Sequence, residues 1–191
     1  NNFEFNGIVS CLKPQTPDLP ETSLGCNATS FELNWPASSN ASNYFINVAS
    51  DFNFINNLTG YENKELGNLL SENISGLNTG GTYYVRLKSG NSCAESSHSN
   101  TIKVAVPETI YTGTWSNGTP NASKKVRFST GLNLNADLEA CSCQIDNGVV
   151  MHVDSGVVLR VENGLDVQGS GTLIFENNAS LIQTNNTPDI N

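Results

Sequence analysis

Five cysteines and two histidines are the residues of this 191-residue chain whose types most often carry chemistry. No two cysteines have the Cys-x-x-Cys spacing of a zinc site, and His98 and His152 lie far apart in the sequence. The pattern therefore does not favour zinc. In an exported protein cysteines form disulfides by default, and the odd count leaves at least one thiol without a partner inside the chain. The five are Cys11, Cys26, Cys93, Cys141 and Cys143.

Neither histidine has the surroundings of a catalytic base. His98 lies among serines in a predicted loop, and His152 alternates with Val150 and Asp154 on one face of a predicted strand. A nucleophilic triad needs a histidine oriented by an acid beside a hydroxyl or thiol, and glycoside hydrolysis needs two carboxylates that face one cleft. No spacing singles out such a set, so we expect no catalytic residues and no enzyme activity.

Three acidic residues recur in one repeated pattern. Asp146, Asp154 and Glu162 are spaced by eight residues, each following an apolar residue and preceding a small polar residue and a glycine. If the turns stack, their carboxylates would repel one another, and a calcium ion would relieve that repulsion. The alternative, which we favour, is that each acid bonds to its own turn backbone. Apart from this calcium hypothesis we expect no metal and no cofactor.

Composition excludes several classes of partner. The formal charge is −9, and only 9 residues are Lys or Arg. Nucleic-acid binding needs basic side chains that replace counterions on phosphates, so we expect no nucleic-acid partner. No apolar run approaches the roughly 20 residues of a membrane span.

The chain opens on Asn1 without a signal peptide, so we expect a piece of a longer protein.

Short alternating strands predict an antiparallel sandwich in the first half. Polar turns, such as residues 38–42 and 90–92, separate the strands, and Pro36 ends one of them. Two sheets packed on one core require this pattern of one apolar and one polar face per strand. The alternating apolar residues are Phe31, Leu33 and Trp35, then Tyr44, Ile46 and Val48, then Tyr83, Val85 and Leu87, and finally Ile102, Val104 and Val106.

Residues 74–87 resemble the E–F corner of a fibronectin type III domain, with Leu77 before a turn and Tyr83 six residues later. The resemblance covers residues 18–106 and implies that Trp35 is the core tryptophan and that the Tyr83 hydroxyl bonds to upstream backbone. In the implied topology Cys26 and Cys93 lie at opposite ends of the sandwich. Cys11 approaches Cys93 more easily, so Cys11 and Cys93 are the candidate disulfide.

The second half carries an internal repeat. Residues 145–148, 153–156 and 161–164 each read apolar, acidic, small polar, glycine. A fixed short period indicates stacked β-structure, in which about three such units make one rung of a β-solenoid. A meander of hairpins is the alternative. The expected division is residues 1–17 as a strand-like segment and Pro-rich connector, 18–106 as the sandwich, 107–120 as a linker, 121–183 as the solenoid and 184–191 as a truncated tail.

A second resemblance rests on residues 114–120, 140–142 and 176–183. Residues 110–187 resemble a module of large cell-surface and secreted proteins of Bacteroidota, which are exported by the type IX secretion system and often carry fibronectin-like domains ahead of this module. The resemblance implies an extracellular or cell-surface location.

The expected fold is therefore all-β, a fibronectin type III-like antiparallel sandwich followed by a short, repetitive β-helix-like solenoid. The expected function is a non-catalytic structural or adhesive module that assembles into fibres by strand addition, with other copies or further parts of the same polypeptide as partners. The alternative is an accessory carbohydrate-binding or spacer domain of a secreted polysaccharide-degrading enzyme, with surface glycans as partners. A cluster of exposed aromatic rings would favour this alternative, and the candidates are Trp115, Tyr111, Tyr61 and Tyr84.

Overall fold

The computed structural model describes residues 11–185, and all the regular structure in them is β-strand. The described chain divides into two compact units, which we treat separately. Unit 1 comprises residues 11–22 and 29–104, and unit 2 comprises residues 23–28 and 105–185. The strand-like segment that we expected at residues 3–8 lies outside the described residues. Of residues 11–185, none lies in a helix with the length and apolarity that a bilayer crossing requires.

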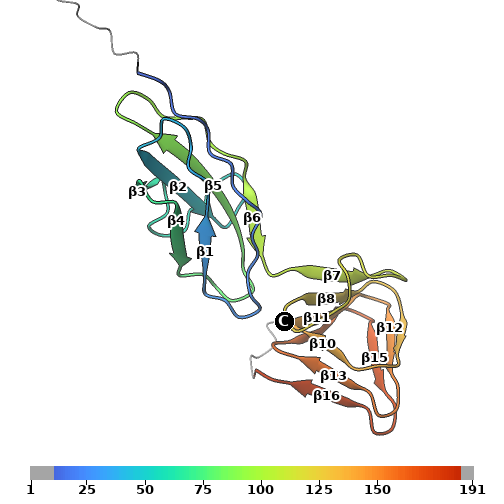
Figure 1. The fold of residues 1–191 in the computed structure, drawn as a ribbon. Coiled ribbons are helices and arrows are strands. Elements are labelled where there is room, and N and C mark those ends of the chain that lie inside the picture. The colour runs from blue at the N-terminus through green and yellow to red at the C-terminus, as the bar shows by residue number, and fades with distance from the viewer. Residues whose placement is uncertain (1–10, 186–191) are drawn as a thin grey trace, which may run out of the picture. The chain divides into compact units, whose positions relative to one another are not determined.

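Unit 1 is a sandwich of two antiparallel sheets (Figure 1). One sheet pairs β1 with β4, and the other has the order β3-β2-β5-β6. The alternating strands predicted the antiparallel sandwich, and the resemblance of residues 18–106 implied its fibronectin type III-like form; this fold class is confirmed. The strands are β1 (Ser30–Asn34), β2 (Asn43–Ala49), β3 (Lys64–Gly67), β4 (Ser71–Ser75), β5 (Thr82–Gly90) and β6 (Ile102–Ala105).

The N-terminal residues 11–22 pack on the sandwich instead of forming a separate connector. Pro14 and Pro17 are buried, and the Gln15 amide donates to the carbonyl of Ser39 at 3.0 Å. The Asn100 side chain accepts from the amide of Leu19 and donates to its carbonyl, each at 2.8 Å. The sequence-based boundary at residue 17 is therefore wrong, because proline stiffness indicates an extended chain without showing what that chain packs against.

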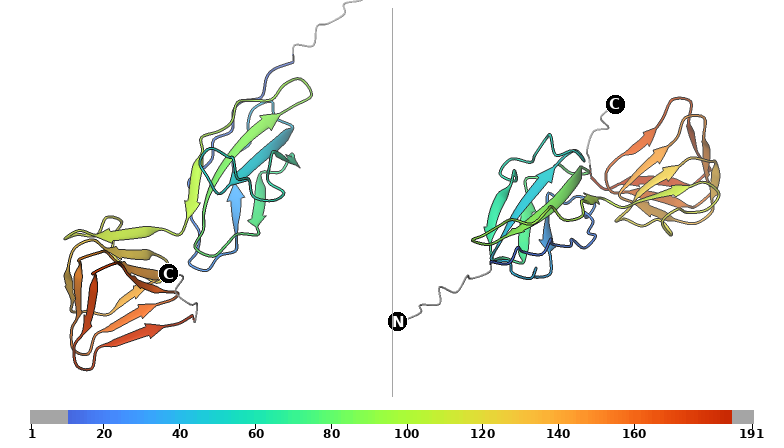
Figure 2. Two further views of the ribbon diagram at one scale, coloured as in Figure 1. Left: turned by 180° about the vertical axis from the view of Figure 1, so that it is seen from behind. Right: turned by 90° about the horizontal axis from the view of Figure 1, so that it is seen from above.

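Unit 2 is a parallel β-solenoid with three sheets as its three sides (Figures 1 and 2). Every strand pair in it is parallel, which excludes the meander of hairpins. Partners in the second and third rungs are 22 residues apart, as in Val150 with Thr172. Strand β7 (Glu108–Tyr111) precedes three rungs. The first rung comprises β8 (Lys125–Phe128), β9 (Leu132–Leu134) and β10 (Leu138–Ala140). The second comprises β11 (Ser142–Ile145), β12 (Val150–Val153) and β13 (Val158–Val161). The third comprises β14 (Leu165–Val167), β15 (Thr172–Phe175) and β16 (Ser180–Gln183).

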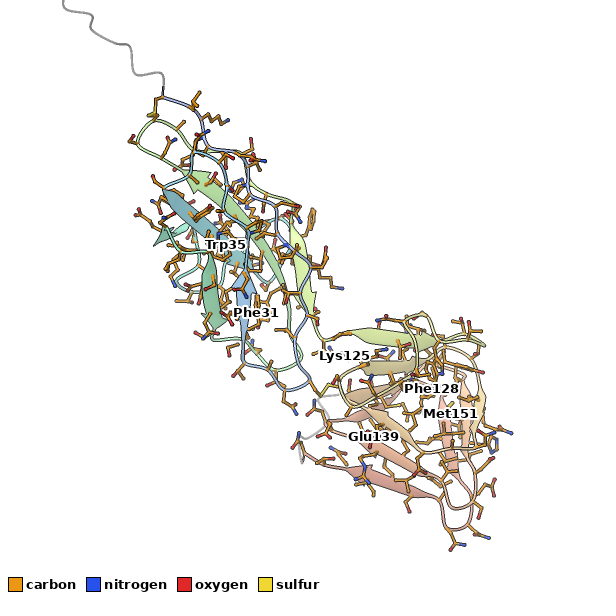
Figure 3. All side chains as sticks on the ribbon, in the orientation of Figure 1. Phe31, Trp35, Lys125, Phe128, Glu139 and Met151 are labelled. Carbon is orange, nitrogen blue, oxygen red and sulfur yellow. A yellow bond between two sulfur atoms is a disulfide. The ribbon has the colours of Figure 1, made fainter. Side chains whose placement is uncertain are left out.

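The eight-residue repeat corresponds to one side of a rung and its corner. Gly148 and Gly156 end consecutive sides with φ values of 75° and 80°, which side chains with a Cβ rarely adopt. Inward side chains alternate along each strand and fill the solenoid, as Phe128 and Met151 show in Figure 3. Both are fully buried. The repeat therefore runs around the solenoid, while stacking follows the 22-residue spacing.

Residues 107–120 are part of the solenoid and not a linker. Strand β7 pairs with β8 in parallel along its whole length, from Glu108 with Lys125 to Tyr111 with Phe128. Residues 112–120 form a folded loop after this strand. The density of glycine and proline that suggested a boundary instead reflects that loop, with Gly113 at φ 100° and Gly118 at φ 65°.

Candidate functional site

The residues expected to build the sandwich core lie inside unit 1, except Val106, which belongs to unit 2. Trp35 is buried, and its ring meets Tyr44 edge-on at a centroid distance of 5.8 Å; Figure 3 labels it among the side chains of unit 1. Leu77 and Tyr83 are buried as well, and the Tyr83 hydroxyl accepts a hydrogen bond from the Asn78 amide at 2.7 Å. A Cβ at Gly81 would lie 2.8 Å from that hydroxyl, so the corner also requires glycine at this position.

Four cysteines form two disulfides. Cys11 is joined to Cys93, with their Cα atoms 6.1 Å apart, and this is the candidate pair. The second joins Cys26 to Cys141, with their Cα atoms 5.4 Å apart and a sequence separation of 115. It holds residues 23–28 within unit 2. Cys143 is free and buried, and burial raises the pKa of its thiol to about 12. It is therefore an inert core residue in the folded chain.

The two histidines lie in different units and have different surroundings. His98 is exposed in unit 1, where partial burial and the charges of Arg86 and Lys88 lower its pKa. In unit 2 the His152 Nδ1 atom lies 3.8 Å from a carboxylate oxygen of Glu176. The contact links the second rung to the third at the solenoid surface. Within residues 11–185 neither histidine forms a hydrogen bond with a hydroxyl or thiol group.

The calcium hypothesis is wrong, because it required three acidic residues to stack and they do not. Asp146, Asp154 and Glu162 follow β11, β12 and β13, the three sides of a single rung, so they lie at different corners and do not stack. Asp146 instead accepts hydrogen bonds from Arg127 at 2.8 Å and from the Ser129 hydroxyl at 2.7 Å. These bonds lower its pKa to about 2. Among residues 11–185 no group of three His, Cys, Asp or Glu side chains is placed to hold a metal ion.

Two of the four candidate sugar-stacking aromatics lie together in unit 2. The rings of Tyr111 and Trp115 are 4.9 Å apart between centroids and tilted by 56°, and both are half-buried. The Trp115 ring also meets Phe128 edge-on at 5.6 Å. Of the other two, Tyr61 is buried, and its hydroxyl bonds to the backbone of β4. Tyr84 lies in unit 1 beside the exposed ring of Phe52.

A hydrogen-bonded loop after β7 holds the aromatic pair in place. The Ser116 amide donates to the carbonyl of Ile110 at 3.0 Å, and the Ser116 hydroxyl accepts from the Ile110 amide at 2.9 Å. The loop therefore folds back along β7 and sets Trp115 against Tyr111. The Lys124 ammonium donates to the carbonyls of Asn117 and Thr119, which fixes the end of the loop.

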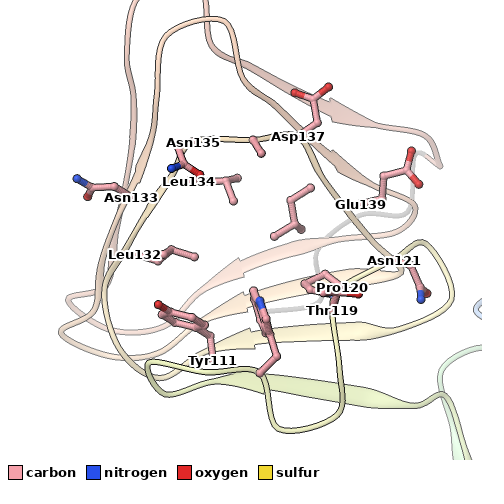
Figure 4. Close-up of a pocket in the computed structure, with 13 residues that line it drawn as sticks. Tyr111, Thr119, Pro120, Asn121, Leu132, Asn133, Leu134, Asn135, Asp137 and Glu139 are labelled. Carbon is pink, nitrogen blue, oxygen red and sulfur yellow. The ribbon is translucent and has the colours of Figure 1, made fainter.

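Tyr111 and Trp115 line a pocket of about 470 Å³ at the first rung (Figure 4). Its inner wall is apolar and includes Leu132, Leu134 and Leu138. These leucines belong to strands β9 and β10. Among the described strands, each of these two pairs along one edge only, so the backbone N–H and C=O groups of its other edge have no strand partner. The polar residues of the lining are Thr119, Asn121, Asn133, Asn135, Asp137 and Glu139.

Sequence reasoning named both rings of this pocket but not the pocket itself. The pocket lies at a first rung that is shorter than the later ones, which the strand registers show and no sequence motif marks. Met151 pairs with Leu132 and Cys143 with Val126, offsets of 19 and 17 residues instead of 22. A shorter rung encloses a smaller layer, and the loop with Trp115 only partly covers that layer.

Solved structures that resemble this chain cover about half of it. No protein-family model matches the chain, and a comparison with curated proteins finds no match. Among solved structures, an Fn3-like protein from Clostridium thermocellum is 18% identical, with a TM-score of 0.37, over 48% of this chain and 91% of that one. The fibronectin type-III domain of human fibronectin type III domain containing protein 3 is 19% identical, with a TM-score of 0.36, over 52% and 91%. A β-1,2-glucanase from Parabacteroides distasonis is 14% identical, with a TM-score of 0.36, over 48% of this chain and 12% of the glucanase.

Proposed function

We propose that this chain is a non-catalytic structural and adhesive module of an extracellular protein, and that its third solenoid rung accepts a rung of another copy by strand addition. Head-to-tail repetition of that contact builds a fibre. The proposal rests on one observation, the composition and exposure of β14, β15 and β16. Two further features support it.

The third rung is built like an interior rung. Its inward positions repeat those below it, as Leu173 stacks on Met151 and Leu181 stacks on Leu159. Each of its three strands pairs on one edge only among the described strands. Four apolar side chains of these strands are 36–42% exposed, namely Val167, Ile174, Leu181 and Ile182. Val167 and Leu181 occupy inward positions, opposite the buried Ile145 and Leu159, so the apolar layer to which they belong is open to a further rung.

Disulfides support an extracellular location, because they persist in oxidising compartments. The partners of the polar groups support a structural role. Asp146 on the second rung bonds to Arg127 on the first rung. Asn147, also on the second rung, accepts hydrogen bonds from the amide and the hydroxyl of Ser170 on the third rung. These bonds hold neighbouring rungs together. Export by the type IX system, suggested by the resemblance of residues 110–187, stays a prediction.

Light scattering and electron microscopy over a range of protein concentrations test the proposal. We expect the parent chain to associate and Leu181→Lys to remain monomeric, because a charge at an inward position of the third rung blocks stacking of a further apolar layer. The matched control is Val150→Lys, an exposed outward position on the second rung, which should associate like the parent. Deletion of residues 1–10 tests whether that segment donates a strand. A parent chain that stays monomeric at high concentration contradicts assembly altogether.

A further inference from the structure

We propose that the pocket beside Tyr111 and Trp115 binds a neutral sugar residue at the end of a surface or matrix polysaccharide. This site is separate from the third rung, so the proposal goes beyond the proposed function and does not depend on it. Its residues all belong to unit 2.

The faces of the two rings are apolar and only partly exposed to solvent. Tyr111 and Trp115 are half-buried although both contact Phe128, which is fully buried. A pyranose ring has C–H groups that pack on aromatic faces while its hydroxyls stay polar. Side chains with an apolar body and a polar tip, such as Tyr and Trp, suit a ligand of this mixed character. A purely aliphatic ligand would leave the polar groups of the lining unpaired.

Hydrogen-bonding groups surround the rings. Strands β9 and β10 have one unpaired edge each at the pocket, and their backbone amides and carbonyls suit sugar hydroxyls, which both donate and accept. The side chains of Asn133 and Asn135 make no hydrogen bond with other described residues and are exposed. Figure 4 shows Leu132 and Tyr111 on the same side of the opening and Asp137 and Glu139 on its outer rim. A sugar chain that leaves the pocket would pass this polar rim.

The charge at the rim of the pocket favours neutral glycans over acidic ones. The rim carries Asp137, which accepts a hydrogen bond from the Val158 amide at 2.8 Å, and Glu139, which lies 3.8 Å from the Arg160 guanidinium. One basic side chain therefore faces two carboxylates here, and the whole chain has a formal charge of −9. Carboxylates accept hydrogen bonds from hydroxyls but repel uronic acids, sulfates and phosphates. The ligand is therefore a neutral saccharide and not an acidic one.

Size limits the ligand to one enclosed residue. A pocket of about 470 Å³ lies in the lower half of the range for small-molecule sites, roughly 300–1,000 Å³. A single hexose has about twelve non-hydrogen atoms, which at the efficiency of ordinary ligands corresponds to a dissociation constant of about 2 mM. Such weak binding is useful only when many copies act together, as they would on a polysaccharide surface.

Nuclear magnetic resonance of the full chain tests the proposal, because the indole N–H groups of Trp115 and Trp35 give two separate signals. The probes are neutral hexasaccharides of β-1,4-glucose, β-1,4-xylose, β-1,4-mannose, β-1,3-glucose and α-1,4-glucose, each up to about 20 mM, or roughly ten times the expected dissociation constant. We expect at least one of them to shift the Trp115 signal saturably while Trp35 does not respond. Oligogalacturonate should not shift either signal.

Variants identify the site. Trp115→Leu keeps an apolar side chain against Phe128 and should weaken binding by about tenfold or more. Asn135→Ala, at an exposed position, should weaken it severalfold without disturbing the rung. Tyr84→Leu is the matched control in unit 1 and should bind like the parent.

The proposal fails if no neutral sugar shifts the Trp115 signal, or if Tyr84→Leu weakens binding as much as Trp115→Leu. It also fails if a synthetic peptide of residues 1–10 occupies the pocket and the sugars do not, because the pocket would then be a strand acceptor. Each of these results leaves assembly at the third rung to be judged by its own scattering experiment.

Discussion

Replacement of Asp146 by asparagine should destabilise unit 2 in a pH-dependent way. The carboxylate accepts from the Arg127 guanidinium at 2.8 Å, from the Ser129 hydroxyl at 2.7 Å and from the Gln144 amide at 3.0 Å. These bonds lower the pKa of Asp146 from 3.8 to about 2. Asparagine preserves the shape of the side chain but removes its charge, so Asp146→Asn isolates the contribution of the charge.

The size of the effect follows from the pKa. A fall from 3.8 to about 2 corresponds to about 2.4 kcal/mol in favour of the folded, charged form. Arg127 is two-fifths exposed, so screening by water reduces the expected contribution to about 1–1.5 kcal/mol. Because the pKa is lowered by folding, this stabilisation is fully present above about pH 4 and is lost as the pH falls towards 2.

Urea unfolding of the full chain at several pH values measures this contribution. In a Trp35→Phe background Trp115 is the single tryptophan, and its fluorescence reports on unit 2. Asp146→Asn should cost about 1–1.5 kcal/mol at pH 7 and much less at pH 2.5. Asp154→Asn is the matched control, since the Asp154 carboxylate makes no ion pair with the described residues. A cost for Asp146→Asn that does not change with pH, or an equal cost for Asp154→Asn, would refute the reasoning.

Three further predictions follow from the structure. Trp35→Ala should lower the stability of unit 1 by about 3–5 kcal/mol, because the buried ring leaves a cavity; a loss below about 1 kcal/mol in urea unfolding followed by circular dichroism would contradict its core position. Iodoacetamide should label Cys143 only after unfolding, since its thiol is buried with a pKa near 12, and peptide mapping should recover Cys11 with Cys93 and Cys26 with Cys141. Thermal melting should be the same with calcium and with chelator, because Asp146, Asp154 and Glu162 lie at separate corners; a higher melting temperature in calcium would revive the calcium site.

The fold class could be read from the sequence because its signals are local. Leu77 and Tyr83 lie within one turn of each other, and alternating apolar residues mark each sandwich strand. The eight-residue spacing likewise follows from the geometry of a single corner, which Gly148 and Gly156 provide. Such patterns report which backbone conformation a short segment adopts, and in these strands they were sufficient.

The site could not be read in the same way because it depends on contacts between distant residues. The calcium hypothesis requires Asp146 to stack on residues eight positions away, whereas stacking follows 22 residues and its partner Arg127 lies 19 residues away. Cys26 pairs with Cys141 across 115 residues, and nothing in the local sequence of either selects the other. The pocket beside Trp115 arises from the shortness of the first rung, which only the registers of β8 and β9 show.

Hydrogen exchange at different protein concentrations tests the central claim most directly. Backbone amides on the open edges of β14, β15 and β16 should exchange fast in dilute solution and become protected as the concentration rises, while amides of β2 and β5 in unit 1 keep the same protection throughout. Leu181→Lys should abolish the concentration dependence, and Val150→Lys should leave it intact. If scattering shows association while exchange at β14, β15 and β16 stays unchanged, the third rung is not the surface that joins the copies, and the account is contradicted.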